Sequence, residues 1–307
     1  MAIAAESGLP LASVGIPTYN RPAGLRRTIA AMRVQTWGNL EIVISDNGSP
    51  DPEVEAVCRS AAAEDPRIRY VRQTKNLGAR ANFEFVLREA RGEYFVWAAD
   101  DDTWEPFFIE RCVKTHLALG PSVALVQMAV PVTVGDHVFP LLNQGAGFHA
   151  AVGGTSHDRI ANLLRNAYAN LVYGVARHEA LFQPGKRTVD IGNEMQLLVF
   201  VAAQGEIIAL PEVGMYKGIP RKKVYDHQHW EIEGGLRPQW WRPRNVFKML
   251  RYHRQVLASI RDALNRVDLT EIERASLDAL ATKILRRHAL HMAINWIPPA
   301  ASAKARL

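Results

Sequence analysis

The chain has 307 residues, of which 48% are hydrophobic and 22% are charged, and 37 Lys and Arg against 31 Asp and Glu give a net charge of +6. This length and hydrophobic share predict a large core, in one α/β domain or in one domain with an appendage. No stretch approaches the roughly 18 to 20 uninterrupted apolar residues of a membrane span, and the amino-terminal residues have no basic region before their apolar ones. These features argue against a membrane-spanning or exported protein, and we expect a cytoplasmic location.

The first 130 residues alternate short apolar runs with amphipathic runs, which is the pattern of β-α-β units in a mostly parallel sheet. Three helix starts are marked by a proline in the first turn, at Pro22, Pro52 and Pro106. The predicted strands are 13–19, 41–46, 68–73, 94–98 and 124–128. The predicted helices between them are 22–35, 52–63, 79–90 and 106–119.

The alternation fades after about residue 130 into a glycine-rich stretch, 131–154, that predicts a long loop on the substrate side. Helices are predicted at 158–167 and 193–204, and two short strands within 206–218. From 244 to about 291 the pattern predicts two or three basic helices. The second half therefore has structure of its own, but with a less regular order of elements.

Polar residues gather where the predicted strands end. The segments that follow the first four strands are PTYNR (17–21), SDNGSPD (45–51), KNLGARAN (75–82) and DDD (100–102). Ligands of open α/β sheets bind outside the carboxyl ends of the strands, so these segments predict one site at one edge. Neither G-x-G-x-x-G nor G-x-x-x-x-G-K-[ST] occurs, which disfavours dinucleotide enzymes and P-loop NTPases.

The three consecutive aspartates favour a metal site. Adjacent carboxylates beside an apolar strand repel one another and rise in pKa unless a cation compensates. Oxygen ligands suit Mg²⁺ or Mn²⁺, and such an ion would neutralise a pyrophosphate. In the alternative reading, Asp102 caps the next helix, Asp100 and Asp101 are merely solvated, and Asp46 is a turn residue. The occurrence of both acidic segments at successive strand ends favours the ligand site.

Taken in this order, the motifs resemble those of the family 2 glycosyltransferases of the GT-A fold. The resemblance covers about residues 12–120 as a series of four motifs and continues more weakly through 170–181 and 190–218. It implies an α/β protein with the GT-A fold, a Rossmann-like mixed sheet flanked by helices, followed by a C-terminal helical extension. The implied activity is inverting transfer of a sugar from a UDP-sugar, or a dTDP-sugar, to an acceptor hydroxyl.

The resemblance also implies domain bounds. The GT-A catalytic domain would span 1–225, with a nucleotide-binding half at about 10–128 and an acceptor-side half at about 129–225. The helical extension would span 226–307. The implied partners are a nucleotide-sugar donor and an acceptor that could be a surface polysaccharide, a lipid-linked glycan or a small natural product.

Carried over position by position, the resemblance assigns roles to the strand-end residues. Those assigned to nucleotide binding are Pro17, Thr18, Tyr19, Arg21, Asp46, Asn76, Arg80, Asp100 and Asp101. Among them Asp46 would accept a hydrogen bond from N3 of uracil or thymine. The metal, Mn²⁺ or Mg²⁺, would be held by Asp102 with Asp100, or by Asp102 with Asp101. The choice stays open because Ala99 occupies the first acidic place of the family's usual Asp-x-Asp-Asp.

The same resemblance points to a general base. Displacing a nucleoside diphosphate needs charge neutralised on the leaving group, and inversion needs one base to take the acceptor's proton. Glu194 matches the family's acidic position, and Asp190 is the alternative, since Met195 follows Glu194 where the family often has aspartate. Without the resemblance, Glu194 would be read as an acidic residue of a helix's first turn.

Three features of the carboxyl-terminal third keep further readings open. His227 and His229 could supply a third metal ligand or could be packed or surface histidines. The segment 242–261 carries six basic residues and no acidic one, with an apolar stripe at helical spacing. We interpret this segment first as a helix that packs on the body of the protein or in a homodimer. The second interpretation is a peripheral helix at the inner face of the membrane. Binding of nucleic acid ranks last, so we expect no nucleic-acid partner. Two alternatives to an enzyme are an inactive sugar-nucleotide-binding protein and a basic membrane or interaction module.

Overall fold

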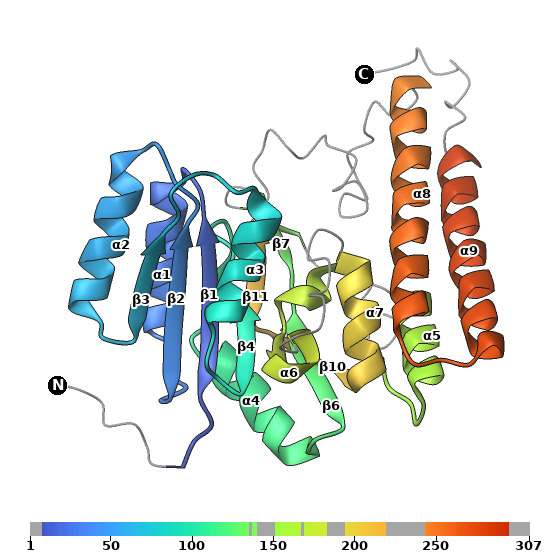
Figure 1. Cartoon of the computed structure of the whole chain (residues 1–307), viewed down its shortest axis with the longest axis horizontal. Coiled ribbons are helices and arrows are strands. Elements are labelled where there is room, and N and C mark those ends of the chain that lie inside the picture. Colours follow the sequence, from blue (N-terminus) through green and yellow to red (C-terminus); the bar gives the residue numbers. More distant parts are fainter. Residues whose placement is uncertain are drawn as a thin grey trace, which may run out of the picture.

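The computed structural model describes residues 8–134, 137–139, 151–166, 169–182, 194–218 and 243–294. A seven-stranded sheet with the strand order β10-β6-β9-β4-β1-β2-β3 forms its centre, and a four-stranded sheet has the order β5-β11-β7-β8. In the large sheet β9 runs antiparallel to both of its neighbours, and the other pairs are parallel. The predicted mixed α/β architecture is therefore confirmed (Figure 1).

The nucleotide-side half follows the predicted alternation. Its elements are β1 (Ala12–Thr18), α1 (Pro22–Arg33), β2 (Leu40–Asp46), α2 (Pro52–Glu64), β3 (Ile68–Arg72), α3 (Ala79–Glu89) and β4 (Tyr94–Trp97). Strands β1, β2 and β4 are buried along almost their whole length because helices cover both faces of the sheet. Proline begins α1 and α2, and the side chain of Asp51 caps α2 by accepting a hydrogen bond from the backbone N–H of Glu53.

The second half is less regular. Its elements are β5 (Thr103–Trp104), α4 (Phe108–Leu119), β6 (Val123–Ala129), β7 (Val132–Val134), β8 (His137–Phe139), α5 (Ser156–Asn166), η1 (Ala169–Tyr173), β9 (Val175–Arg177), α6 (His178–Leu181), α7 (Glu194–Gln204), β10 (Glu206–Val213) and β11 (Met215–Gly218). The long loop predicted over 131–154 is wrong in its first part, where β7 and β8 form a short antiparallel hairpin. Three-residue strands are too short to show a period of two, so the sequence pattern could not reveal them.

Two helices complete the described chain, α8 (Pro243–Arg266) and α9 (Glu271–Ile294). They pack side by side, α8 against α7 and α9 against α5, at the opposite end of the molecule from β3 (Figure 1). Ile260 and Leu264, two members of the predicted apolar stripe, are buried in this packing, whereas Leu250 is exposed. The packed-helix reading thus holds for the carboxyl half of α8. None of the described helices is long and apolar enough to cross a membrane. The predicted boundary near residue 225 lies outside the described residues and stays a prediction.

Candidate functional site

The carboxyl ends of β1, β2 and β4 lie at one edge of the large sheet, because these strands run parallel. Thr18, the last residue of β1, stands opposite Asp46, the last residue of β2. The chain leaves β4 through residues 98–102 before it enters β5. Residues 99–102, which contain the three aspartates, are called the acidic loop below. Parallel pairing thus brings the predicted strand-end residues into one region of the molecule.

Two glycines fix the acidic loop between the two halves of the chain. A Cβ on Gly24 of α1 would lie 2.0 Å from the carbonyl oxygen of Asp100, and a Cβ on Gly218 of β11 would lie 2.0 Å from that of Asp101. No larger side chain fits at either position unless the backbone moves. The acidic loop is therefore held from both sides by backbone contact.

Asp100 and Asp101 are bound by residues from the first strand end. Asp100 is 7% exposed and accepts hydrogen bonds from Thr18 Oγ1 at 2.8 Å and from Arg21 Nη1 at 2.9 Å. The same Arg21 nitrogen lies 2.9 Å from Asp101 Oδ2. Burial raises the pKa of Asp100, and the Arg21 charge opposes that shift. One guanidinium therefore compensates two of the three carboxylates.

Asp102 is bound by the second half of the chain. Its Oδ2 lies 3.0 Å from Lys217 Nζ, and its Oδ1 accepts a hydrogen bond from the backbone N–H of Gly218 at 3.0 Å. Burial raises the pKa of Asp102 to about 6, while Lys217 acts in the opposite direction. The ammonium of Lys217 also lies 4.1 Å from the centre of the Tyr173 ring, a cation–π contact. The alternative reading of Asp102 as a helix cap is wrong, because β5 follows it and α4 begins only at Phe108.

The acidic loop, as arranged, does not fit a divalent metal. Both oxygens of Asp102 and both of Asp100 have partners, and Asp101 is paired through Oδ2. The described residues contain no group of three or more His, Cys, Asp or Glu side chains placed to hold a metal. Arg21 and Lys217 supply two positive charges against the three carboxylates, so part of the compensation that the sequence assigned to a metal comes from the chain itself. His227 and His229 lie outside the described residues.

Asp46 is fully buried beneath Arg72. Its Oδ1 accepts a hydrogen bond from the backbone N–H of Ser49 at 2.9 Å, and its Oδ2 has longer contacts with Arg72 Nε at 3.3 Å and with the Tyr70 hydroxyl at 3.4 Å. The Arg72 side chain is 45% exposed and the Asp46 side chain 0%. A base can therefore reach the Asp46 carboxylate only if Arg72 moves aside.

A buried asparagine that the sequence did not single out ties the strand ends together. Asn82 of α3 accepts a hydrogen bond from Ser45 Oγ at 2.6 Å and donates to the carbonyl oxygens of Ser45 at 3.0 Å and Thr18 at 3.3 Å. Asn76, assigned to the ribose and diphosphate, accepts a hydrogen bond from Asn47 Nδ2 at 3.0 Å and so shapes the loop before α3.

The remaining nucleotide-site residues differ in access to solvent. Pro17 is buried in β1, whereas Tyr19, just beyond the strand, is 42% exposed. Arg80 is exposed in the first turn of α3. Tyr19 and Arg80 thus join the exposed Arg21 and Asn76 as solvent-facing candidates for ligand contact, while Pro17 supports the strand end.

Glu194, the predicted base, is the first residue of α7. Part of its side chain faces solvent, yet the surrounding protein raises the pKa of its carboxyl, and the Lys217 charge opposes that rise. Burial also raises the pKa of Tyr173, with a further contribution from the charges of Asp102 and Glu194. The charge of Lys217, which pairs with Asp102, therefore also acts on Glu194. Asp190, the alternative base, lies outside the described residues.

Lys217 and Tyr173 were missed by the sequence reasoning. Tyr173 lies in a 3₁₀ turn without periodicity, and Lys217 is the next-to-last residue of a short strand that carries no acidic motif. The one local signal was a lysine next to a glycine at the end of a predicted strand. Such a pair is too common to mark a site.

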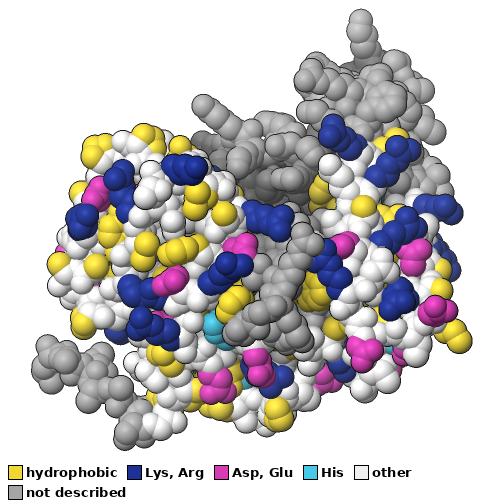
Figure 2. Space-filling view, viewed as in Figure 1, with side chains coloured by type: hydrophobic (Ala, Val, Ile, Leu, Met, Phe, Trp, Pro, Cys, Tyr) yellow, Lys and Arg dark blue, Asp and Glu magenta, His cyan; other side chains and the backbone are white. Residues whose placement is uncertain are grey.

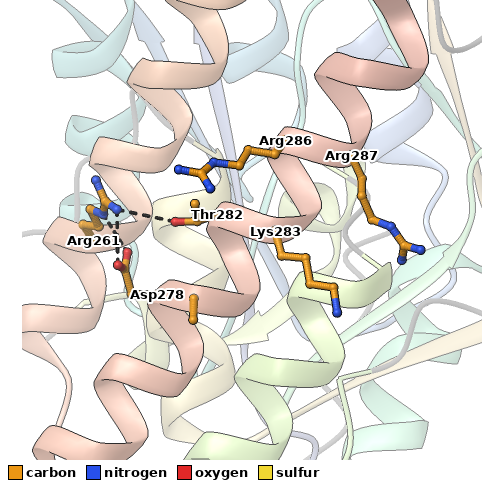
Figure 3. A pocket seen from close by; sticks show the side chains of 7 residues that line it. Arg261, Asp278, Thr282, Lys283, Arg286 and Arg287 are labelled. Atoms are coloured by element: carbon orange, nitrogen blue, oxygen red, sulfur yellow. Dashed lines mark hydrogen bonds and ion pairs between the residues drawn. The ribbon is translucent and has the colours of Figure 1, made fainter. Parts of the chain in front are cut away.

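A second charged region lies on α8 and α9. Figure 2 shows Lys and Arg side chains gathered over these helices. A groove there is lined by Arg261, Asp278, Ala279, Thr282, Lys283, Arg286 and Arg287. Arg261 pairs with Asp278 at 2.6 Å (Figure 3), which leaves the groove with three more positive than negative charges.

Comparison with known proteins identifies the family. Residues 13–162 match the model of glycosyl transferase family 2. Residues 13–162 therefore belong to this family. Among curated relatives, a GalNAc(5)-diNAcBac-PP-undecaprenol beta-1,3-glucosyltransferase of Campylobacter jejuni is 34% identical over 95 residues, which are 31% of this chain and 30% of that protein. The putative colanic acid biosynthesis glycosyl transferase WcaA of Escherichia coli is 36% identical over 97 residues, 32% of this chain and 34% of that protein. The family 2 chain thus spans about a third or less of the length of these relatives.

Solved structures show the fold. Staphylococcus aureus TarS has a TM-score of 0.60 at 13% identity, covering 94% of this chain and 49% of that one. TarS 1–349 in complex with UDP has a TM-score of 0.58 at 14% identity, covering 91% and 71%. Mannosyltransferase PcManGT of Pyrobaculum calidifontis, in complex with GDP-Man and Mn²⁺, has a TM-score of 0.53 at 17% identity, covering 94% and 85%. The family 2 chain therefore has the GT-A fold.

Proposed function

We propose that this family 2 chain transfers a sugar, with inversion, from a UDP-sugar to an acceptor hydroxyl, with a dTDP-sugar as the second choice of donor. The observation that carries the proposal is the pairing of Lys217 with Asp102 of the acidic loop, at the sheet edge where Asp46 also lies, together with the influence of the Lys217 charge on Glu194. That arrangement offers a base-recognition group, a site for the diphosphate and a proton acceptor in one region. The UDP complex of TarS supports the choice of donor.

In the proposed complex Asp46 accepts a hydrogen bond from N3–H of uracil. A carboxylate serves this purpose because it only accepts hydrogen bonds, and N3 of uracil donates one. Asp46 keeps its Oδ1 bond to Ser49 N–H and offers Oδ2, whose contacts with Arg72 and Tyr70 are long. Nucleotide binding then requires Arg72 to swing out, which its half-exposed side chain permits.

The acceptor oxygen forms the new bond to the anomeric carbon while the bond from that carbon to the diphosphate breaks. Glu194 takes the proton of the acceptor hydroxyl, and the nucleoside diphosphate leaves. A base that operates near neutral pH profits from a carboxyl pKa above the ordinary range, which the surroundings of Glu194 favour. A nearby carboxylate also stabilises the positive charge of an oxocarbenium-like transition state. Asp190 stays the alternative base.

The family likeness and the pairing of the aspartates point in opposite directions on metal use. The family likeness and the Mn²⁺ complex of PcManGT favour Mn²⁺ or Mg²⁺. Against them stands the pairing of the aspartates, because an ion at the acidic loop would have to displace Arg21 or Lys217. No step of the proposed transfer is therefore assigned to a metal.

The donor is tested by calorimetry with UDP, dTDP and GDP on the wild type and on Asp46→Asn. We expect UDP to bind, GDP to bind at least about tenfold more weakly, and Asp46→Asn to lose most of that preference. Tight GDP binding with no UDP binding would sink the assignment of Asp46. The replacement Glu194→Gln should then keep UDP affinity and lose turnover. If the wild type binds UDP but turns over no UDP-sugar with any acceptor tried, the inactive binding-protein alternative gains.

We propose a polysaccharide or a lipid-linked glycan as the acceptor. Two relatives support this class, the undecaprenol-linked glucosyltransferase named above and the chondroitin synthase of Escherichia coli, 33% identical over 105 residues. Turnover assays with both acceptor classes and with small natural-product alcohols would separate the three.

The groove on α8 and α9 favours a second, accessory role. We propose that the chain is cytoplasmic and that this groove brings it against the inner face of the membrane, because the excess positive charge of the groove complements anionic headgroups. Cosedimentation with vesicles of phosphatidylcholine, with and without added anionic phosphatidylglycerol, tests this role. The variant K283E/R286E/R287E should lose binding and K114E, on α4, should keep it. Light scattering of the same samples reports whether the chain forms the homodimer that the sequence left open.

A further inference from the structure

Lys217 lies in the candidate donor site as a buried cation with donor capacity left over. Its side chain is 18% exposed, and Asp102 Oδ2 lies 3.0 Å from its Nζ. An ammonium has three N–H donors, and among the described residues Asp102 Oδ2 and Tyr173 engage two of them. The remaining capacity suits an oxygen-rich anion such as a phosphate.

The backbone around Lys217 is fixed rather than adaptable. Met215 and Tyr216 of β11 pair with Trp104 and Thr103 of β5, directly after the acidic loop. Gly218 N–H binds the second oxygen of Asp102, and the Gly218 backbone touches the loop so closely that a Cβ would collide with it. The backbone of β11 therefore places the Lys217 ammonium at the acidic loop.

Two cations of the chain offset all but one of the negative charges in this region without an added ion. Asp100, Asp101 and Asp102 carry three negative charges, and Arg21 and Lys217 carry two positive ones. A divalent ion bound to Asp102 would stand within contact distance of the Lys217 ammonium, because both would compete for one carboxylate oxygen. Like charges at such distances repel strongly in a partly buried site.

Resting on the function proposed above, we infer that Lys217 takes the place of a divalent metal at the diphosphate of the donor. UDP then binds without Mn²⁺ or Mg²⁺, with its phosphate oxygens between Lys217 and Arg21, and Asp102 serves to position Lys217 rather than to ligate a metal. A lysine acts in this way as a compact point charge. The inference reverses the role that the sequence assigned to Asp102.

The experiment measures UDP affinity by calorimetry in EDTA and in Mn²⁺ for four proteins. They are the wild type, Lys217→Met, the double variant K217M/D102N and Lys114→Met, which removes an exposed lysine of α4. The double variant guards against misfolding, because the single variant leaves the buried Asp102 unpaired, whereas the double variant removes the carboxylate too. Circular dichroism reports folding, and electron paramagnetic resonance of free Mn²⁺ reports metal binding.

We expect the wild type and Lys114→Met to bind UDP equally well in EDTA and in Mn²⁺. Both Lys217 variants should lose at least about tenfold in EDTA. Mn²⁺ should restore binding in Lys217→Met, where Asp102 is freed, and not in K217M/D102N. Uptake of Mn²⁺ from solution should likewise be greater for Lys217→Met than for K217M/D102N.

Three results would overturn the inference. Wild-type binding that needs Mn²⁺ refutes the role of Lys217 and leaves the proposed donor intact. Undiminished binding of UDP to K217M/D102N in EDTA shows that Lys217 only neutralises Asp102. A folded wild type that binds UDP in neither buffer refutes the proposed donor and the inference with it.

Discussion

Replacing Gly24 by alanine should destabilise the protein although it improves helix propensity. Gly24 lies in the first turn of α1, where alanine is favoured over glycine by up to about 1 kcal/mol. The new Cβ, however, would lie 2.0 Å from the Asp100 carbonyl oxygen, where ordinary contacts are 3.4–4 Å. The clash is with backbone on both sides, so no side-chain rotation relieves it, and overpacking of this kind costs about 1–3 kcal/mol.

The displacement should also weaken the bonds that the acidic loop makes. If α1 and the loop move apart, Asp100 loses contact with Thr18 or Arg21, and a hydrogen bond to a charged group contributes about 1.5–3 kcal/mol. Against the helix gain, we expect a net loss of about 2 kcal/mol in the free energy of unfolding. UDP affinity should fall as well, since the loop carries the proposed diphosphate site.

Urea unfolding followed by circular dichroism, with calorimetry of UDP, measures both effects. Gly38→Ala is the matched control, because its Cβ would meet nothing nearer than Leu9 Cδ1 at 4.0 Å. The control should stay within about 0.5 kcal/mol of the wild type. A Gly24→Ala protein at least as stable as the wild type, with unchanged UDP affinity, would show that the loop is not held against α1 as described.

Two further predictions concern buried polar groups. Asn82→Ala should lower the free energy of unfolding by about 2–3 kcal/mol, because the Ser45 hydroxyl and the carbonyls of Ser45 and Thr18 lose their buried partner. The control Asn39→Ala, which removes one hydrogen bond to Leu9, should lower it less. Equal losses in urea unfolding would contradict this account. Burial lowers the pKa of His116 to about 4, so on acidification the unfolded chain takes up its proton first, near 6.5, and stability falls. Between pH 7 and pH 5 this residue should lower the free energy of unfolding by about 2 kcal/mol, and His116→Gln should not show this loss. If the urea midpoints of the two proteins change in parallel with pH, His116 does not contribute in this way.

The sequence predicted the nucleotide-side half well because its signals are local. Apolar runs bounded by helix-starting prolines place β1 to β4 within a few residues, and parallel order then brings the strand ends together. The partner of Asp102 could not be predicted, since Lys217 is 115 positions away and meets it only through the antiparallel pairing of β11 with β5. The role of Asn82 was hidden in the same way, because its partners lie on two strands.

Strand β11 links the two ends of the proposed reaction. Lys217 lies against Asp102, where the diphosphate would leave, and its charge lowers the pKa of Glu194, where the proton would go. Arg21, by contrast, contacts Asp100 and Asp101 and none of the other acidic site residues that the structure describes. Removing Lys217 should therefore change both the binding of the leaving group and the pKa of Glu194. Removing Arg21 should change only the binding of the leaving group.

The pH dependence of turnover separates these effects. A base must be ionised to accept a proton, so the loss of the Lys217 charge, which lets the pKa of Glu194 rise, moves the acidic limb of kcat to higher pH. We expect that shift in K217M/D102N, together with weaker UDP binding. Arg21→Met should weaken UDP binding and leave the acidic limb of kcat at the same pH. If both variants shift the limb equally, or neither does, β11 does not couple the two sites, and Glu194 is set by other charges.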